Sequence, residues 1–593
     1  MGGSINVVLA PGLNVEAGGT WTRGSNFTRS ISSKDSYRMR LAYDDATSIS
    51  DPSKHYIPNG DMLTESRDIS QAYTLRGQLN YNRAFGKHSV MAIGGMEVSR
   101  TTLDNNAYPT RFGYNDQAGT FSIFNYADYS AGLYRPDMLY GQSLTAGIGA
   151  ISFRDTRFTS WYGNASYEFD RRFLVSGSVR LDLTNFFGTD PKFRYKPIWS
   201  AGGTYKISNE KYFDISWINK LYVRGSYGLN GNIDLNSGPF LIIAPGTGIS
   251  TLTGDVPYII STPPNKSLRW EKTITTNLGT DISFLHSRVN MTFDYYLRRS
   301  QLLLASDLID PTLGYSSLTR NIGQLNNTGL ELTLEGDVLR KKRFVWNVLG
   351  TVSFNKSRVV TYNANYSSAL SLVLGPVNRV GYPGDALFNY RFAGINNAGS
   401  PLYWNAAGQQ IAGANVKPED LVYSGSARPK FTYGLTNTFR YGNVDLAFML
   451  ISKTGFQTRR SGFSGSNYMQ EDVAKRWRNP GDEKSGSIYP KLSTGTESLY
   501  YSYSDVFMEN GNFFKLRDLS LSYHFSRNLI RRAGLSDASV TFQGRNLYLL
   551  TANSDHRDPE AYDPTTVGSN ISDLGYSWLP PRPEFYLGLK LNF

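Results

Sequence analysis

An acid-rich stretch near the C-terminus, Asp555-His556-Arg557-Asp558-Pro559-Glu560, could hold a cation. Carboxylate and carbonyl oxygens are the ligands that calcium prefers. Arg557 interrupts these carboxylates, so we expect no metal site here. The chain has no cysteine, which also leaves no thiolate ligands.

Covalent catalysis finds little support in the sequence. An α/β-type serine hydrolase carries its nucleophile on a sharp strand-to-helix turn, and no stretch of this sequence has the pattern of such a turn. Five histidines limit acid–base chemistry. We therefore predict that the chain is not an enzyme and binds no cofactor.

Aromatic side chains on long connections could stack on sugar rings or hold a peptide. The candidates are Tyr403, Trp404, Tyr500, Tyr501 and Tyr503. The alternative is that these rings pack within their loops or lie at a membrane interface, because Tyr and Trp combine an apolar body with a polar tip. As a set, we predict that they contact a ligand or a covering partner.

The last strand indicates the scaffold that carries these loops. Side chains alternate between the two faces of a strand, so one face here is apolar and the other polar. The apolar face holds Phe585, Leu587, Leu589, Leu591 and Phe593. A soluble sheet can show this pattern too, but a chain that ends on such a strand with a terminal aromatic is typical of outer-membrane β-barrels, where this strand closes the barrel.

About 17 segments repeat this alternation, which predicts an antiparallel transmembrane β-barrel. They are 5–9, 13–22, 73–85, 88–98, 161–169, 173–183, 196–206, 221–229, 272–284, 289–297, 328–336, 345–355, 431–441, 444–453, 516–525, 539–549 and 585–593. Tight turns such as Pro11-Gly12, Asp170-Arg171-Arg172 and Gly442-Asn443 alternate with long connections, as periplasmic turns alternate with outer loops. Segments 36–47 and 386–396 are assigned to loops, because adding either one alone breaks this alternation.

Composition fits a barrel with a wet interior. No run of about 18 apolar residues exists, and 40% hydrophobic residues accompany 14% aromatics and a mean hydropathy of -0.36. The net charge of +12 lies partly in short turns such as Arg171-Arg172 and Arg531-Arg532, which favours lipid headgroups over nucleic acid.

Several charged residues fall on the polar faces of the predicted strands. They are Arg180, Asp182, Asp294, Arg298, Glu331 and Arg545. Because a buried charge is costly unless paired, we expect partners of opposite sign on neighbouring strands.

Eight stretches in order resemble the SusC/RagA-type TonB-dependent transporters. They are WYGNASY (161–167) leading into FLVSGSVRLD (173–182), LYVRGSYGLNGN (221–232), LRWEKT (268–273) with DYY (294–296), NIG (321–323) with NTGLE (327–331), RW (476–477) with NPGD (479–482), FFKLRDLSLSY (513–523), GRNLY (544–548) and DPE (558–560). In that family pattern, DPE is a structural turn.

The resemblance implies a 22-stranded plugged barrel in the cell outer membrane. It implies import of oligosaccharides or peptides, a SusD-like surface lipoprotein as a lid, and a TonB complex that acts through an N-terminal region and plug. Neither the plug nor a TonB box is recognisable in residues 1–593, so we expect a partial barrel without its plug domain and first strands. A passive diffusion pore and a soluble surface glycan-binding β-protein are the alternatives.

Overall fold

The computed structural model describes most of the chain. The described residues are 1–123, 149–185, 192, 195–232, 238–245, 257–310, 312, 314–315, 317–362, 368–374, 378–460, 470–486, 489–492, 496–554, 556–561 and 580–593.

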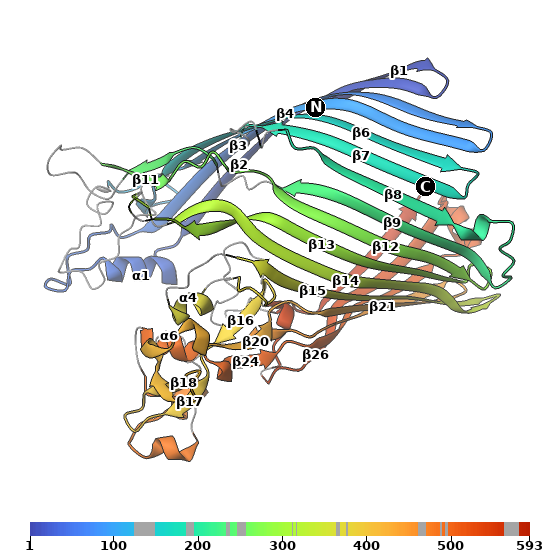
Figure 1. Cartoon of the computed structure of the whole chain (residues 1–593). Helices are drawn as coiled ribbons and strands as arrows, with labels where there is room; N and C mark the ends of the chain where they lie inside the picture. Colours follow the sequence, from blue (N-terminus) through green and yellow to red (C-terminus); the bar gives the residue numbers. More distant parts are fainter. Residues whose placement is uncertain are drawn as a thin grey trace. The chain divides into compact units, whose positions relative to one another are not determined.

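Eighteen strands belong to one antiparallel sheet (Figure 1). They are β1 (Gly2–Ala10), β2 (Leu13–Ser32), β3 (Asp61–Phe85), β4 (His88–Ala107), β5 (Arg111–Tyr114), β6 (Ala150–Phe169), β7 (Phe173–Thr184), β8 (Ile198–Lys206), β9 (Ile218–Asn232), β12 (Glu271–Phe284), β13 (Val289–Leu308), β14 (Ser317–Lys341), β15 (Phe344–Thr361), β21 (Phe431–Tyr441), β22 (Val444–Thr454), β25 (Phe513–His524), β26 (Asp537–Thr551) and β27 (Glu584–Asn592). Each of the 17 predicted segments overlaps one of these strands, so the prediction is confirmed. The additional strand is β5, which pairs with the start of β3.

The chain forms two compact units. The first comprises Met1–Tyr167, Gly177–Trp199 and Ile233–Trp270. Besides long strands it holds β10 (Ile242–Pro245), β11 (Tyr258–Thr262) and the helix α1 (Tyr37–Asp45). Ser36 caps α1, because its side chain accepts a hydrogen bond from the backbone N–H of Met39. Segment 36–47 is therefore outside the sheet, as predicted, but it is a helix.

The second unit comprises Glu168–Ser176, Ser200–Asn232 and Glu271–Phe593. Its long connections carry short elements of their own. They are α4 (Ala369–Leu374), β16 (Ala386–Asn389), β17 (Phe392–Ile395), β18 (Pro401–Trp404), β19 (Gln410–Ala412), β20 (Val422–Ser426), β23 (Gln457–Arg459), α5 (Gln470–Ala474), α6 (Thr496–Ser502), β24 (Met508–Asn510) and α7 (Arg527–Ile530). The 3-10 turns are η2 (Ile207–Asn209), η4 (Gly413–Asn415), η5 (Pro418–Asp420), η6 (Asp482–Ser485), η7 (Asp505–Phe507), η8 (Arg531–Ala533) and η9 (Pro559–Ala561).

We call the described residues of 368–426 and 456–510 the loop subdomain. Its segments interlock: the backbone N–H of Tyr390 donates to the carbonyl of Tyr503, and that of Asp505 donates to the carbonyl of Tyr390. Segment 386–396 contributes β16 and β17 to this subdomain and lies outside the large sheet, which confirms its assignment to a loop.

Tight turns join neighbouring strands where the sequence predicts them. Gly86 between β3 and β4 and Gly442 between β21 and β22 take φ values of +58° and +57°. Glycine accepts this left-handed conformation because it has no Cβ. Asp170 and Arg171 adopt it as well between β6 and β7.

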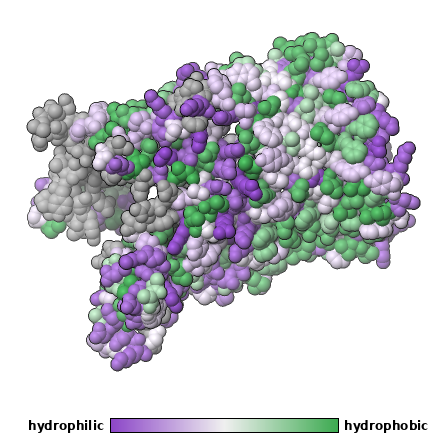
Figure 2. Space-filling model, in the orientation of Figure 1, coloured by the Kyte–Doolittle hydropathy of each residue, from purple (hydrophilic) through white to green (hydrophobic). Residues whose placement is uncertain are grey.

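The apolar side chains of the strands are exposed. Leu587 in β27 is 78% exposed, Leu75 in β3 59% and Leu278 in β12 57%. In contrast, the clusters of buried hydrophobic residues are built from loop segments and strand ends, such as Met39 with Phe112 and Tyr390 with Tyr403. Figure 2 shows hydrophobic residues gathered over the β13 to β21 strands and hydrophilic ones over the loop subdomain. Outward-facing apolar rows argue against the alternative of a soluble protein with a dry core.

Within the described residues, no helix is both long and apolar enough to cross a membrane.

Candidate functional site

The polar face of the sheet carries paired charges. Arg180 in β7 donates to Asp182 at 2.7 Å and to the hydroxyl of Ser160 in β6 at 2.9 Å, and it lies 3.7 Å from Glu97 in β4. Arg545 in β26 lies 3.6 Å from Asp518 in β25. The Arg545–Asp518 contact confirms the predicted pairing of opposite signs on neighbouring strands, whereas the carboxylates near Arg180 lie on its own strand and on β4.

Two further predicted charges, Arg298 and Glu331, have different neighbours. The Arg298 guanidinium lies 4.7 Å from the centroid of the Tyr296 ring. Glu331 stands opposite Asp294 in the register of β13 and β14, which is a like-charged neighbour. Among the described residues neither of these two forms an ion pair, so for them the pairing stays a prediction.

Glycine positions leave room for side chains that cross the sheet. Gly279 in β12 lies between Arg224 in β9 and Asp294 in β13 in register, and the guanidinium reaches over it to the carboxylate at 2.6 Å. A Cβ at Gly279 would overlap the Asp294 carboxylate. The Tyr296 ring covers Gly329 in the same way, so a residue of the DYY stretch contacts one of the NTGLE stretch.

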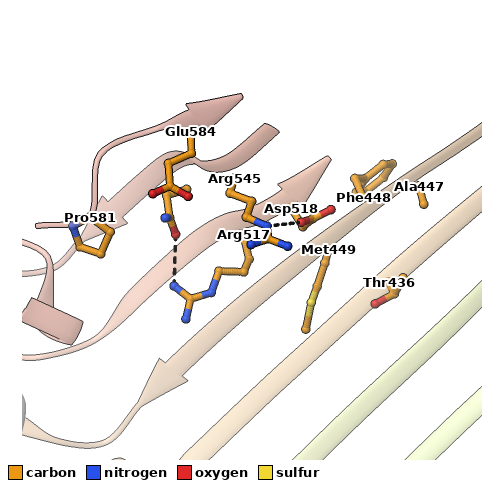
Figure 3. A pocket seen from close by; sticks show the side chains of 10 residues that line it. Thr436, Ala447, Phe448, Met449, Arg517, Asp518, Arg545, Pro581 and Glu584 are labelled. Atoms are coloured by element: carbon orange, nitrogen blue, oxygen red, sulfur yellow. Dashed lines mark hydrogen bonds and ion pairs between the residues drawn. The ribbon is translucent and has the colours of Figure 1, made fainter. Parts of the chain in front are cut away.

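A hollow of about 640 Å³ opens where β22, β25, β26 and the start of β27 meet (Figure 3). Met449, Asp518, Arg545 and Glu584 stand opposite one another in the registers of these strands and form a row. The lining thus combines both signs of charge with an apolar thioether. Such a recess offers donors and acceptors to a hydrated ligand or a polypeptide.

Beside this hollow, two stretches of the family pattern, 513–523 and 558–560, meet in one ion cluster. Lys515 in β25 donates to Asp558 at 2.6 Å and to Glu560 at 3.0 Å. Lys453 and Arg517 also donate to Glu560, at 2.9 and 2.8 Å. The side chains of Lys515 and Asp558 are only 2% and 3% exposed. The cluster therefore fixes the start of the β26–β27 connection to the sheet.

These contacts show what the carboxylates of the acid-rich stretch bind. Burial alone would raise the pKa of Glu560, but hydrogen bonds and charges from Lys453 and Lys515 outweigh it and hold this pKa at about 2. Asp558 and Glu560 are bound by cationic side chains within a turn that includes η9. Asp555 lies outside the described residues. The sequence alone did not identify Lys515, Lys453 or Arg517 as the partners.

The predicted loop aromatics divide into two groups. Tyr403, Tyr501 and Tyr503 are 0%, 0% and 3% exposed, and they form part of the hydrophobic clusters of the loop subdomain. Burial raises the pKa of Tyr403 and Tyr501 above the usual range, so their hydroxyls stay neutral. These three rings have no free face for a ligand in this conformation.

Trp404 and Tyr500 keep partly exposed surface. The Tyr500 ring lies against Gly413, where a Cβ would overlap it, and 5.3 Å from the Tyr390 ring. Trp404 ends β18 and its backbone N–H donates to the carbonyl of Arg391. Of the five candidates, these two are therefore placed to touch a ligand, and ligand contact remains a prediction.

Comparison with known proteins bears on the whole chain. The family model described as "TonB dependent receptor-like, beta-barrel" matches residues 10–547. TonB-dependent receptor P3 of Formosa agariphila is 23% identical over 565 residues, which cover 90% of this chain and 53% of the relative. TonB-dependent receptor SusC of Bacteroides thetaiotaomicron is 25% identical, with coverage of 75% and 44%. The chain thus spans about half the length of the curated relatives it matches.

A solved structure, described as that of the RagAB peptide transporter, has the same fold. It superposes with a TM-score of 0.76 at 19% identity and covers all of this chain and 61% of its own. The likeness supports the strand order and the predicted antiparallel barrel class.

Proposed function

Since the chain belongs to the TonB dependent receptor-like β-barrel family, we propose that it forms the wall and outer loops of a SusC/RagA-type importer. The imported ligand is an oligosaccharide or a peptide. A SusD-like lipoprotein covers the loops, and a TonB complex supplies the force through a plug and an N-terminal region.

The family match over residues 10–547 carries this proposal. The location is the cell outer membrane, where exposed apolar rows such as that of β27 meet lipid. The paired charges of the polar face suit a water-filled interior, because Arg180 and Arg224 there have a hydroxyl and a carboxylate within reach. The description of the RagAB structure as a peptide transporter supports the peptide class, and the oligosaccharide class follows from the resemblance to SusC/RagA-type transporters.

Uptake by the complete protein in its own outer membrane tests the mechanism. We expect labelled oligosaccharides or peptides to enter only while the inner-membrane proton gradient is maintained. Uptake that continues at the same rate after the gradient is collapsed would instead identify a passive diffusion pore.

Two aromatic substitutions test the ligand-facing surface. Trp404→Ala and Tyr500→Ala should each weaken ligand binding roughly fivefold, because stacking on an aromatic ring contributes about 1 kcal/mol. Tyr441→Ala is the matched control, since Tyr441 is 63% exposed but lies beside the tight turn at Gly442. Equal effects of all three substitutions would exclude Trp404 and Tyr500 as specific ligand contacts.

A further inference from the structure

The loop subdomain buries a guanidinium group that has no carboxylate beside it in the part of the chain that the structure describes. Arg459, the last residue of β23, is 5% exposed. Its Nη2 donates to Oδ1 of Asn389 at 2.6 Å and to the carbonyl of Phe388 at 3.3 Å. Within the described residues no ion pair involves Arg459, although mixed-sign pairs are common elsewhere in the chain.

Most of the hydrogen-bonding capacity of this pair is unused. Among the described residues Nε and Nη1 of Arg459 have no acceptor, and together they carry three of the five N–H groups of a guanidinium. Nδ2 of Asn389 has no acceptor either, and Asn389 is 0% exposed. The unused donors therefore belong to two side chains that are already hydrogen-bonded to each other.

A bound anion would stabilise the buried Arg459 guanidinium more than a neutral molecule would. An unpaired buried ion costs several kcal/mol. The Tyr503 ring, 4.6 Å from the guanidinium carbon, offsets only part of this cost. Burial lowers the pKa of Arg459 only to about 10, so the group stays charged at neutral pH. A water molecule could accept a hydrogen bond, but it would leave the charge uncompensated.

We propose that Arg459 and Asn389 bind a small inorganic anion of the halide class. The near-complete burial of both residues excludes a bulky anion. Because Asn389 belongs to β16 and Arg459 to β23, the bound anion joins two loop segments that are far apart in the sequence. It acts as a structural clamp of the loop subdomain, independently of the transported ligand.

Bromide tests this site directly in the complete protein. In crystals grown with bromide, we expect an anomalous peak within hydrogen-bonding reach of Arg459 and Asn389. In solution, amide exchange in β16 and β23 should slow about 100-fold at a bromide concentration 100 times the dissociation constant, compared with bulky gluconate at equal ionic strength. No anomalous peak and equal exchange in both salts would overturn the proposal.

Substitutions separate the site from general salt effects. Asn389→Asp places a carboxylate at 2.6 Å from Nη2 and should make exchange slow and independent of bromide. Arg460→Met is the matched control, because Arg460 donates to the hydroxyl of Tyr489 instead, and it should keep the full bromide effect. Arg459→Met removes the charge itself, but this variant could fail to fold. The test therefore uses Asn389→Asp, and a bromide effect that persists in Asn389→Asp would refute the assignment.

Discussion

Removal of the Lys515 ammonium should release the turn that includes η9. The Lys515→Met substitution keeps the side-chain volume but leaves Asp558, 3% exposed, without its cation. Breaking a buried pair in this way costs about 3 to 5 kcal/mol. Glu560 keeps Lys453 and Arg517, so only one carboxylate is orphaned, and we expect the lower end, about 3 kcal/mol.

Hydrogen exchange of two backbone amides reports this loss locally. The N–H of Ala561 donates to the backbone carbonyl of Asp558, and the N–H of Glu560 donates to Oδ1 of the Asp558 side chain. A loss of about 3 kcal/mol should speed their exchange by roughly 100-fold. Arg440→Met is the control, because the Arg440 side chain is 62% exposed in its pair with Asp445, and such pairs contribute about 1 kcal/mol at most.

The reasoning fails if Lys515→Met speeds exchange by less than about fivefold, as a solvent-exposed pair would. A second variant distinguishes the lost charge from lost packing. Lys515→Met combined with Asp558→Asn removes both charges, and it should recover much of the stability that the single substitution loses.

Three further predictions concern pH, packing and lipid. The folded pKa of Glu560 lies below its ordinary value of 4.5, so the Glu560 carboxylate stabilises the fold fully above pH 4.5 and loses this effect as pH falls towards 2. Hydrogen exchange at the Glu560 amide, corrected for the intrinsic rate, should therefore speed up over that range. Gly279→Ala should lower the free energy of unfolding in urea by about 1 to 3 kcal/mol, because the added Cβ displaces the Arg224–Asp294 ion pair. Gly225→Ala is the control: its Cβ meets only ordinary contacts, so it should leave this free energy unchanged. Leu278→Arg should cost about 2 to 4 kcal/mol in refolding into lipid vesicles, and Asn277→Arg on the opposite face less than 1.

The strands were predictable because one physical pattern specifies them. Lipid on one side and water on the other impose strict alternation, as in β27. Strand β5 was missed because Arg111–Tyr114 spans four residues, too few to show a period. The helix α1 was not recognised, since Tyr37, Met39 and Leu41 alternate like a strand and only the Ser36 cap indicates a helix start.

The loop contacts were less predictable because they join residues distant in the sequence. Nothing local to Tyr403 indicates that Tyr390 and Tyr501 bury it while the adjacent Trp404 stays partly exposed. The Lys515–Asp558 pair spans 43 residues. Its two stretches could be singled out from the family pattern, but only the fold shows that they meet.

Accessibility of single cysteines along β14 tests the central claim, that lipid covers one face of the sheet and water the other. The chain has no native cysteine, so spin labels can be placed singly at Leu330, Glu331, Leu334 and Glu335. In lipid vesicles, we expect collisions with oxygen to dominate at the two leucine positions and collisions with a water-soluble nickel chelate to dominate at the two glutamate positions. Equal accessibility at all four positions, or the reverse order, would contradict the account.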